Sequence, residues 1–489
     1  MKNLVLVQPG IGDMDMFRDK PTPPLGLLCA ASVICREIEV RVVDQRLDSG
    51  WRARLAAAID GETVAVGLTA MTGQMIFHAL EAAGEARRHT PAPLIWGGIH
   101  ASLLPAQTVA HEFADYVVEG EGEAALAELT RRLASGADTS GIPGVWRKKE
   151  GKAEAPPQAS LLDVEALPPV PYHLVDMEKY AQTYKGGKIF FYQSSRGCPC
   201  RCAYCYNRTF SRGRLRAKSA ELALKEIKDL RARYDFSLVY LLDDNFFIDQ
   251  RRAMAILAGL KAMGLGCVLQ GVDIETLARM QDADLDFLEE SGVVRITIGV
   301  ESGVDRVRRD IMNKGGSLEL ARRQVARFSG RKIVVFCSFI VGLPTETREE
   351  IRATMDLGME ILKLGDNFRI AQFYIFSPYP GTELFSGLEK DGVLFPKKLE
   401  EWGEYEWDYS HMHENSPQLK DFLERACFVS KFLDRKMDDY GAGSGALRIL
   451  YNLYRPFAWF RLKSGFLKPL PERWCYGVLK NIFAGSSGH

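Results

Sequence analysis

Residues 194–207 read Ser194-Ser195-Arg196-Gly197-Cys198-Pro199-Cys200-Arg201-Cys202-Ala203-Tyr204-Cys205-Tyr206-Asn207. Four of the ten cysteines of the chain fall within the eight residues from Cys198 to Cys205, and three of them are spaced C-x3-C-x2-C. Cysteine thiolates hold iron–sulfur clusters. Because three thiolates leave one iron of a four-iron cluster without a protein ligand, that iron can bind another molecule. The stretch therefore predicts a metal site with Cys198, Cys202 and Cys205 as ligands.

Two other interpretations of these cysteines stay open at this point. A structural zinc site would need a fourth protein ligand, which Cys200 or a distant histidine could supply. Disulfide bonds are disfavoured because nothing in the sequence marks secretion, and disulfides are rare in the cytosol. We interpret Cys200 as a bystander that could substitute for a neighbouring ligand when that ligand is mutated.

Composition sets limits on the fold and on the partners. A chain of 489 residues is too long for one ordinary core, so two or three domains are expected. Lys plus Arg and Asp plus Glu both number 63, and this balance gives no argument for nucleic acid as a partner. The first apolar run, residues 4–7, is too short for a signal peptide, and no run is long enough to span a bilayer. A cytoplasmic protein is expected.

The N-terminal third alternates short apolar runs with helical stretches, which predicts a doubly wound, Rossmann-like α/β domain with a parallel sheet. Ligands bind beyond the carboxyl ends of the strands in such domains, and small or polar residues gather at those ends here. The predicted strands are 4–7, 40–43, 64–68, 94–96 and 116–118, and the predicted helices are 25–36, 51–59, 74–88 and 123–133.

Residues 141–184 are rich in proline and lose hydrophobic periodicity, which predicts a linker. Strand–helix alternation then restarts, and the cysteine stretch follows the first of the new strands. Six parallel strands with intervening helices predict a partial (β/α)6 barrel of the TIM type, whose reactive residues sit at the carboxyl ends of the strands. The predicted strands are 188–193, 238–242, 267–271, 294–300, 333–341 and 368–376.

The cysteine spacing, with Tyr204 just before the last cysteine, resembles the radical S-adenosylmethionine (SAM) superfamily. The resemblance implies a [4Fe–4S] cluster on Cys198, Cys202 and Cys205, with SAM on the fourth iron. It further implies that Tyr204 lies against the adenine and that motifs at the later strand ends contact SAM. The residues implied to bind SAM are Tyr204, Asp243, Asp244, Glu301, Ser302 and Gly342. Relatives often carry an Arg near Gly271; this chain does not.

A PPLG segment, a GG-x-H loop and an EGE loop precede the cysteines in that order, which resembles the cobalamin-binding domain of cobalamin-dependent radical SAM enzymes. Residues 12–17 lack the histidine that ligates cobalt from below in other cobalamin domains, which implies a lower face without a protein ligand, packed by residues 69–74. His100 is interpreted either as a corrin contact or as a loop histidine bonded to local backbone. The residues implied to bind cobalamin are Pro24, Gly26, Thr69, Met71, Thr72, Gly97, Gly98, His100, Gly120, Glu121 and Gly122.

The predicted organisation is a cobalamin-binding domain at 1–140, a linker at 141–184, a radical SAM barrel at 185–388 and a mainly helical region at 389–489. Aromatic and histidine residues crowd into 402–413, where Tyr405, His411 and His413 are candidate acids or bases. Residues 446–485 are basic and aromatic, as in helices at membrane surfaces. Core packing for the first group, and a docked tail or a dimer contact for the second, are the alternatives.

The resemblance implies a C-methyltransferase that acts on an unactivated carbon, with a lipid or another hydrophobic molecule as the candidate substrate. A 5′-deoxyadenosyl radical would remove a substrate hydrogen, and methylcobalamin would supply the methyl group. It also implies a reducing partner such as flavodoxin or ferredoxin. One alternative is a cyclase or rearrangement enzyme that uses cobalamin without methylating. Another, of a different class, is a cobalamin sensor with a catalytically silent barrel. Substrate, stereochemistry and oligomeric state are outside what the sequence predicts.

Overall fold

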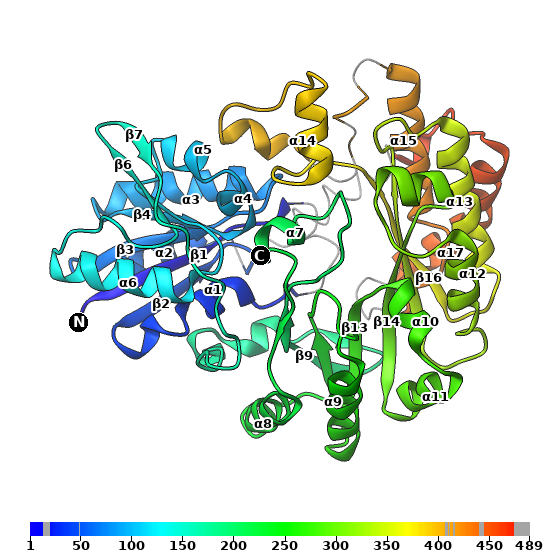
Figure 1. The fold of residues 1–489 in the computed structure, drawn as a ribbon, viewed down its shortest axis with the longest axis horizontal. Coiled ribbons are helices and arrows are strands. Elements are labelled where there is room, and N and C mark those ends of the chain that lie inside the picture. Colours follow the sequence, from blue (N-terminus) through cyan, green and yellow to red (C-terminus); the bar gives the residue numbers. More distant parts are fainter. Residues whose placement is uncertain are drawn as a thin grey trace.

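The structure is a computed structural model that describes residues 1–12, 20–47, 49–405, 409, 411–413, 416–439 and 445–473. Two sheets face each other across the molecule, with the short helix α7 (Asn207–Phe210) between them (Figure 1). The predicted α/β class is confirmed, with the N-terminal sheet at one end and the helical C-terminal region at the other.

The N-terminal sheet has the strand order β2-β1-β3-β4-β5-β6-β7, and its first five strands are parallel. All six residues of β1 are buried, because helices cover both faces and form two separate cores. The strands are β1 (Asn3–Gln8), β2 (Glu39–Asp44), β3 (Thr63–Thr69), β4 (Leu94–Gly97) and β5 (Tyr116–Val118). The main helices are α1 (Leu25–Ala31), α2 (Trp51–Ala58), α3 (Met75–His89) and α6 (Gly122–Ser135).

Two features of this domain differ from the sequence prediction. The first part of the predicted linker forms β6 (Val145–Lys149) and β7 (Lys152–Glu154), which extend the sheet as an antiparallel hairpin. Two short helices, α4 (Gly98–Leu103) and α5 (Pro105–Ala110), lie between β4 and β5. Short helices of one or two turns give too little hydrophobic periodicity to be seen in the sequence.

The second sheet has the order β16-β15-β14-β13-β12-β9-β8, in which six strands are parallel and β8 (Thr183–Tyr184) adds an antiparallel edge. Among the residues that the structure describes, no pairing closes the sheet between β16 and β8, and the predicted partial barrel is confirmed. Its parallel strands are β9 (Gly187–Tyr192), β12 (Leu238–Leu241), β13 (Gly266–Val272), β14 (Val293–Glu301), β15 (Val334–Val341) and β16 (Phe368–Ile375). Its helices are α8 (Ala220–Arg231), α9 (Gln250–Ala262), α10 (Ile274–Arg279), α11 (Asp282–Glu290), α12 (Leu318–Ala326), α13 (Arg348–Leu362) and α14 (Glu383–Lys390).

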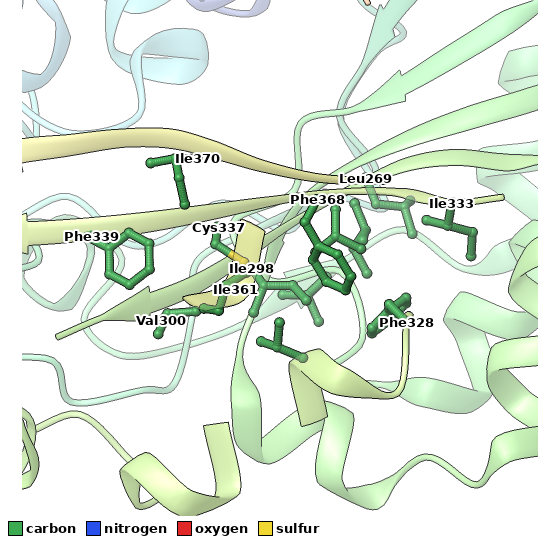
Figure 2. Close-up of a cluster of buried hydrophobic side chains, with 14 of the residues drawn as sticks. Leu269, Ile298, Val300, Phe328, Ile333, Cys337, Phe339, Ile361, Phe368 and Ile370 are labelled. Atoms are coloured by element: carbon green, nitrogen blue, oxygen red, sulfur yellow. The ribbon is translucent and has the colours of Figure 1, made fainter. Parts of the chain in front are cut away.

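The largest core lies between this sheet and its helices. Alternate residues of β14 and β15, such as Ile298, Cys337 and Phe339, point into it and meet Ile361 of α13 (Figure 2). Because strand side chains alternate between faces, the intervening residues belong to the concave face, which is the side that can hold ligands.

The C-terminal region is mainly helical, as predicted, with α15 (Pro417–Ser430), α16 (Lys436–Asp439) and α17 (Gly445–Ser464). Helix α15 ends at Ser430, and the chain turns before α16. In this turn the Asp434 carboxylate accepts a hydrogen bond from the Ile370 amide at 2.7 Å, which covers part of the edge strand β16. Within the described residues, no helix is long and apolar enough to cross a membrane.

Candidate functional site

A cavity of about 430 Å³ opens where the two domains meet. One wall consists of the carboxyl ends of β1, β3, β4 and β5 and the loops that follow them. The opposite wall comes from the cysteine loop and α7, through Arg196, Tyr206, Asn207 and Phe210, together with Asp244 after β12. The strand ends of the first domain and the start of the barrel therefore face one shared space.

The cysteine loop is held at both ends by buried hydrogen bonds. Asp243 accepts from the Ser194 hydroxyl at 2.8 Å and from the Ser195 hydroxyl, and Asp244 accepts from the Gly197 amide at 2.8 Å. On the far side of the loop, the Ala203 amide donates to the Met312 carbonyl at 2.8 Å. The loop is consequently fixed to the end of β12 and to the residue that follows the short helix Val307–Ile311 before any ligand is bound.

Gly197 makes the tight entry to the loop possible. Its φ of +87° lies in the left-handed region, and a Cβ at this position would lie 2.1 Å from the Arg214 carbonyl oxygen. Only glycine fits such a position.

The three predicted ligand thiols differ in their surroundings. A hydrogen bond from Cys200 lowers the pKa of Cys198 to about 7, whereas burial raises the pKa of Cys205 to about 12. Within the described part of the chain, no three His, Cys, Asp or Glu side chains are arranged to hold one metal ion. A zinc site needs all its ligands around a single ion, whereas each thiolate of a cluster binds a different iron. The arrangement therefore fits a cluster better than zinc.

Ion pairs buried at the cavity wall join the two domains. Arg196, two residues before the first ligand, contacts Glu121 at 3.0 Å and Glu123 at 2.6 Å, and Arg216 also pairs with Glu121. Burial alone would raise the pKa of Glu121, but hydrogen bonds from Arg216 and the Leu162 amide and the charge of Arg196 lower it overall. Glu121 thus remains a carboxylate that holds the cysteine loop against the N-terminal domain.

The cavity brings together most of the residues implied to bind cobalamin. Gly98 shows why glycine is needed at this wall: its φ is +87°, and a Cβ there would lie 2.4 Å from the Thr69 hydroxyl oxygen. The predicted residues that line the cavity are Gly26, Thr69, Met71, Gly97, Gly98, Gly120, Glu121 and Gly122.

Pro24, Thr72 and His100 do not line the cavity. His100 is fully buried, its Nδ1 lies 2.9 Å from the Thr72 hydroxyl, and its ring packs 5.8 Å from that of Trp402. Burial lowers its pKa to about 4, so the imidazole is neutral near pH 7. His100 therefore does not match the interpretation as a corrin contact. Its side chain has partners within the protein, but it bonds to the Thr72 hydroxyl rather than to local backbone. No histidine is among the described residues of the cavity wall.

The residues implied to bind SAM fall into two groups. Burial and the nearby charges of Glu301 and Cys202 raise the pKa of Tyr204, and the Lys314 ammonium lies 3.6 Å from Glu301. Glu301 has a φ of +71°, which is unusual for a residue other than glycine and is found at functional sites. Burial opposes the charge of Lys314, but Glu301, Cys202 and Asp273 raise its pKa overall, so it stays a cation.

The side chains of the second group, Asp243 and Ser302, make their hydrogen bonds within the protein. Asp243 is buried against Ser194 and Ser195, and Ser302 is fully buried with its hydroxyl 3.2 Å from that of Thr354 in α13. Both side chains therefore position the strand ends. Asp244 differs, because it lines the cavity besides accepting from Gly197.

Of the three acid–base candidates, only His413 lies beside a residue implied to bind SAM. A Cβ on Gly342 would lie 3.4 Å from the His413 Cε1, and burial lowers the pKa of this histidine. Tyr405 and His411 instead stack on each other with ring centroids 4.2 Å apart, next to Trp402.

Sequence reasoning did not name Arg216 or Lys314, whose charges only the fold brings to the cysteine loop. Both are lone charged residues outside the motifs, so they give no spacing signal. Glu123 and Glu346 stand in strand-end motifs, but sequence reasoning assigned them no role of their own. Burial raises the pKa of Glu346 to about 7, and its Oε2 accepts from the Leu343 amide at 3.0 Å.

Two protein-family models match the two domains that form this site. The B12 binding domain model matches residues 18–130, and the radical SAM superfamily model matches residues 192–358. The chain belongs to the cobalamin-dependent radical SAM enzymes. The family implies a [4Fe–4S] cluster, SAM and cobalamin as cofactors, and it uses reductants such as flavodoxin.

Named relatives of this radical SAM enzyme include methyltransferases and cyclases. An uncharacterised methyltransferase of Pyrococcus horikoshii is 28% identical over 89% of this chain and 94% of its own length. Cytidylyl-2-hydroxyethylphosphonate methyltransferase of Streptomyces wedmorensis is 28% identical, covering 69% of this chain and 67% of its own. The anaerobic magnesium-protoporphyrin IX monomethyl ester cyclase of Rubrivivax gelatinosus is 25% identical, covering 71% and 59%.

Solved structures share the fold. The cobalamin-dependent SAM radical enzyme OxsB with aqua-cobalamin bound has a TM-score of 0.69 at 16% identity, covering 100% of this chain and 76% of its own. TsrM of Kitasatospora setae, a radical SAM methyltransferase with cobalamin and a [4Fe–4S] cluster bound, has a TM-score of 0.64 at 21% identity, covering 80% and 75%.

The residues present fit these cofactors. The cysteine loop offers the three predicted ligand thiols besides Cys200, and Lys314 adds a cation beside Cys202. At the cavity wall, glycines such as Gly97, Gly98 and Gly120 leave room for a large flat ligand against the backbone.

Proposed function

We propose that this enzyme is a C-methyltransferase that acts on an unactivated carbon of a small or hydrophobic molecule. The observation that carries the proposal is the shared cavity, whose walls come from the strand ends of the cobalamin domain and from the cysteine loop. A radical formed at one wall and a methyl donor held at the other would act on the same substrate.

The cofactors supply the reactive species when bound: the cluster and SAM give a 5′-deoxyadenosyl radical, and methylcobalamin gives the methyl group. The protein's own residues have other tasks in this proposal. Lys314 would pair with the SAM carboxylate, and Glu301, 3.6 Å from Lys314, would reach the ribose or methionine part of SAM, while Tyr204 would pack against the adenine. Asp243 and Asp244 keep the cysteine loop in place through Ser194, Ser195 and Gly197.

For cobalamin, the proposed contacts are the glycines and Thr69 at the strand ends. Met71 and Met75 would pack against the bound cobalamin at this wall, whose described residues include no histidine.

The test uses anaerobic, cluster-loaded protein with hydroxocobalamin, titanium(III) citrate and SAM labelled with deuterium in its methyl group. We expect labelled methylcobalamin, S-adenosylhomocysteine and 5′-deoxyadenosine, measured by mass spectrometry. Cys202→Ala should form no 5′-deoxyadenosine. Cys200→Ala is the matched control, because it removes a thiol from the same loop without removing a predicted ligand.

Two outcomes would count against methyl transfer. Formation of 5′-deoxyadenosine without methylcobalamin or S-adenosylhomocysteine would favour the second candidate, a cyclase or rearrangement enzyme, which the cyclase of Rubrivivax gelatinosus supports. Cobalamin binding with none of the three products in cluster-loaded protein would favour a sensor. Addition of a cell lipid extract, followed by a search for lipids that gain three deuterium atoms, tests the hydrophobic substrate.

We also propose a cytoplasmic location and flavodoxin or ferredoxin as the electron donor. The ligand cysteines must stay reduced, which the cytosol provides. Reduced flavodoxin in place of titanium(III) citrate should support the same products.

A further inference from the structure

Helix α17 presents a row of large apolar side chains to solvent. Ile449, Leu453, Phe457 and Phe460 are 61%, 71%, 43% and 55% exposed, and their spacing of three or four residues places them on one face of the helix. Phe466, just after the helix, is 48% exposed. These five residues are called the α17 stripe below.

The exposed large apolar side chains are clustered in the α17 stripe rather than spread evenly over the described surface. Five of the twelve large apolar side chains that are exposed in the described part of the chain lie in it, within 18 residues. Isolated exposed apolar residues are normal on protein surfaces, whereas a contiguous group marks an interaction site.

The opposite face of α17 fixes the direction in which the stripe points. Ala458 and Leu462 are buried in the large core, and the Trp459 indole donates to the Leu433 carbonyl at 2.8 Å. Arg461 is buried and pairs with Glu472 at 2.7 Å. The helix is therefore anchored along one side, and rotation cannot hide the stripe.

The surface beside the stripe is positively charged. A cavity of about 550 Å³ next to Phe466 is lined by Arg348, Arg425 and Lys468 and by a single carboxylate, that of Asp421. Asp421 is shared, because it pairs with both Arg425 and Lys468, and Arg348 lies over the Phe422 ring. The cavity therefore keeps an excess of positive charge.

From this arrangement we infer that the α17 stripe is a docking surface for a membrane of anionic phospholipids. The apolar side chains would enter the boundary between headgroups and acyl chains, and the cationic cavity would take phosphate groups. The positive charge beside the stripe argues for an anionic surface rather than for a second copy of this chain, whose stripe would bring the same charge.

The position of the stripe is compatible with catalysis at the membrane. α17 lies beyond β16, at the opposite end of the molecule from the N-terminal sheet (Figure 1). Docking through it would leave the cavity between the domains open. The basic segment predicted over 446–485 continues past Arg473 into residues outside the described part of the chain.

The test measures co-flotation of the full-length protein with vesicles, and it needs no cofactor chemistry. We expect binding to vesicles of phosphatidylcholine with phosphatidylglycerol, but not to phosphatidylcholine alone, and a decrease at high salt. Leu453→Ser/Phe460→Ser should lower the affinity at least about tenfold, because two of the five apolar side chains of the stripe no longer leave water. Lys463→Gln/Lys468→Gln, which removes one cation from the last turn of α17 and one from the cavity, should weaken binding to the anionic vesicles.

The matched control is Leu394→Ser, which replaces an 88% exposed leucine outside α17 and should bind like the wild type. Equal melting temperatures would show that the variants are folded. Absence of binding to anionic vesicles, or equal binding by Leu453→Ser/Phe460→Ser, would overturn the inference. Sedimentation gives a further outcome: a lipid-free dimer that this double variant converts to a monomer would make the stripe a self-association face instead.

Discussion

At the scale of single residues, Glu121 is the carboxylate on which the domain interface depends. Replacing it by glutamine leaves the largely buried Arg216 without its carboxylate partner and leaves Arg196 with Glu123 alone; breaking a buried ion pair typically costs about 3 kcal/mol or more. We expect Glu121→Gln to lower the melting temperature of the cofactor-free protein. The lowered pKa of Glu121 adds stability that is present above the ordinary carboxyl pKa and is lost in acid, and the variant should lose less in acid than the wild type.

The control for this prediction is Glu37→Gln. Glu37 also accepts two hydrogen bonds from one arginine, Arg131, but both side chains are about 42–43% exposed, so the change should have little effect. Equal melting temperatures of the Glu121 and Glu37 variants would contradict the role given to Glu121.

His100 should make the stability of the protein depend on pH. Its pKa is lowered from 6.5 to about 4 by burial, so the folded protein resists its protonation. Stability is therefore full above pH 6.5 and falls as the pH drops toward 4, by about 2 kcal/mol between pH 7.5 and pH 5. His100→Asn should remove this part of the pH dependence in thermal unfolding of the cofactor-free protein. An unchanged dependence in the variant would mean that other groups cause it.

At the scale of elements, the turn from β4 into α4 sets the shape of the cavity. Gly98→Ala should weaken binding of hydroxocobalamin, because the added Cβ would meet Thr69 and Ala70 at 2.4 to 3.0 Å. We expect at least about a tenfold increase in Kd in an absorbance titration, the change that 1.4 kcal/mol produces.

Gly136→Ala separates this effect from backbone strain. Gly136 ends α6 with a φ of +70° and has no atom within 4 Å of an added Cβ. It should therefore cost about 1 kcal/mol of stability without changing the affinity for cobalamin. Tight cobalamin binding by Gly98→Ala would contradict the assignment of this cavity wall.

At the scale of the whole molecule, the segment around Trp402 ties the end of the barrel to the N-terminal domain. The Trp402 indole donates to the Gln107 side chain at 2.8 Å, its carbonyl accepts from the Gly73 amide at 3.1 Å, and the residue is 1% exposed. Together with the pairs of Glu121, these contacts join the domains at two places. Both domains should accordingly unfold together.

Trp402→Ala should lower the free energy of unfolding by about 3–5 kcal/mol, the usual cost of deleting a large buried aromatic side chain. In calorimetry we expect the melting transition to move down and to separate into two. Trp402→Phe keeps a ring but loses the hydrogen bond to Gln107, so it should cost less, about 1 kcal/mol. A single, unshifted transition for Trp402→Ala would show that the domains do not depend on this contact.

The sequence by itself determined the features that depend on local order. Strand–helix alternation predicted both sheets, and the spacing of Cys198, Cys202 and Cys205 predicted the cluster loop, because periodicity and ligand spacing are properties of short stretches. The order of the strand-end motifs further predicted most of the cavity wall.

Only the tertiary structure decided which partners the loop side chains contact. His100 faces Thr72 and Trp402 rather than the cavity, and Glu121 pairs with Arg196 and Arg216. In each case at least one partner lies about 75 residues or more away in the sequence. A buried polar side chain takes whichever partner the fold brings within reach, and no local pattern records that choice.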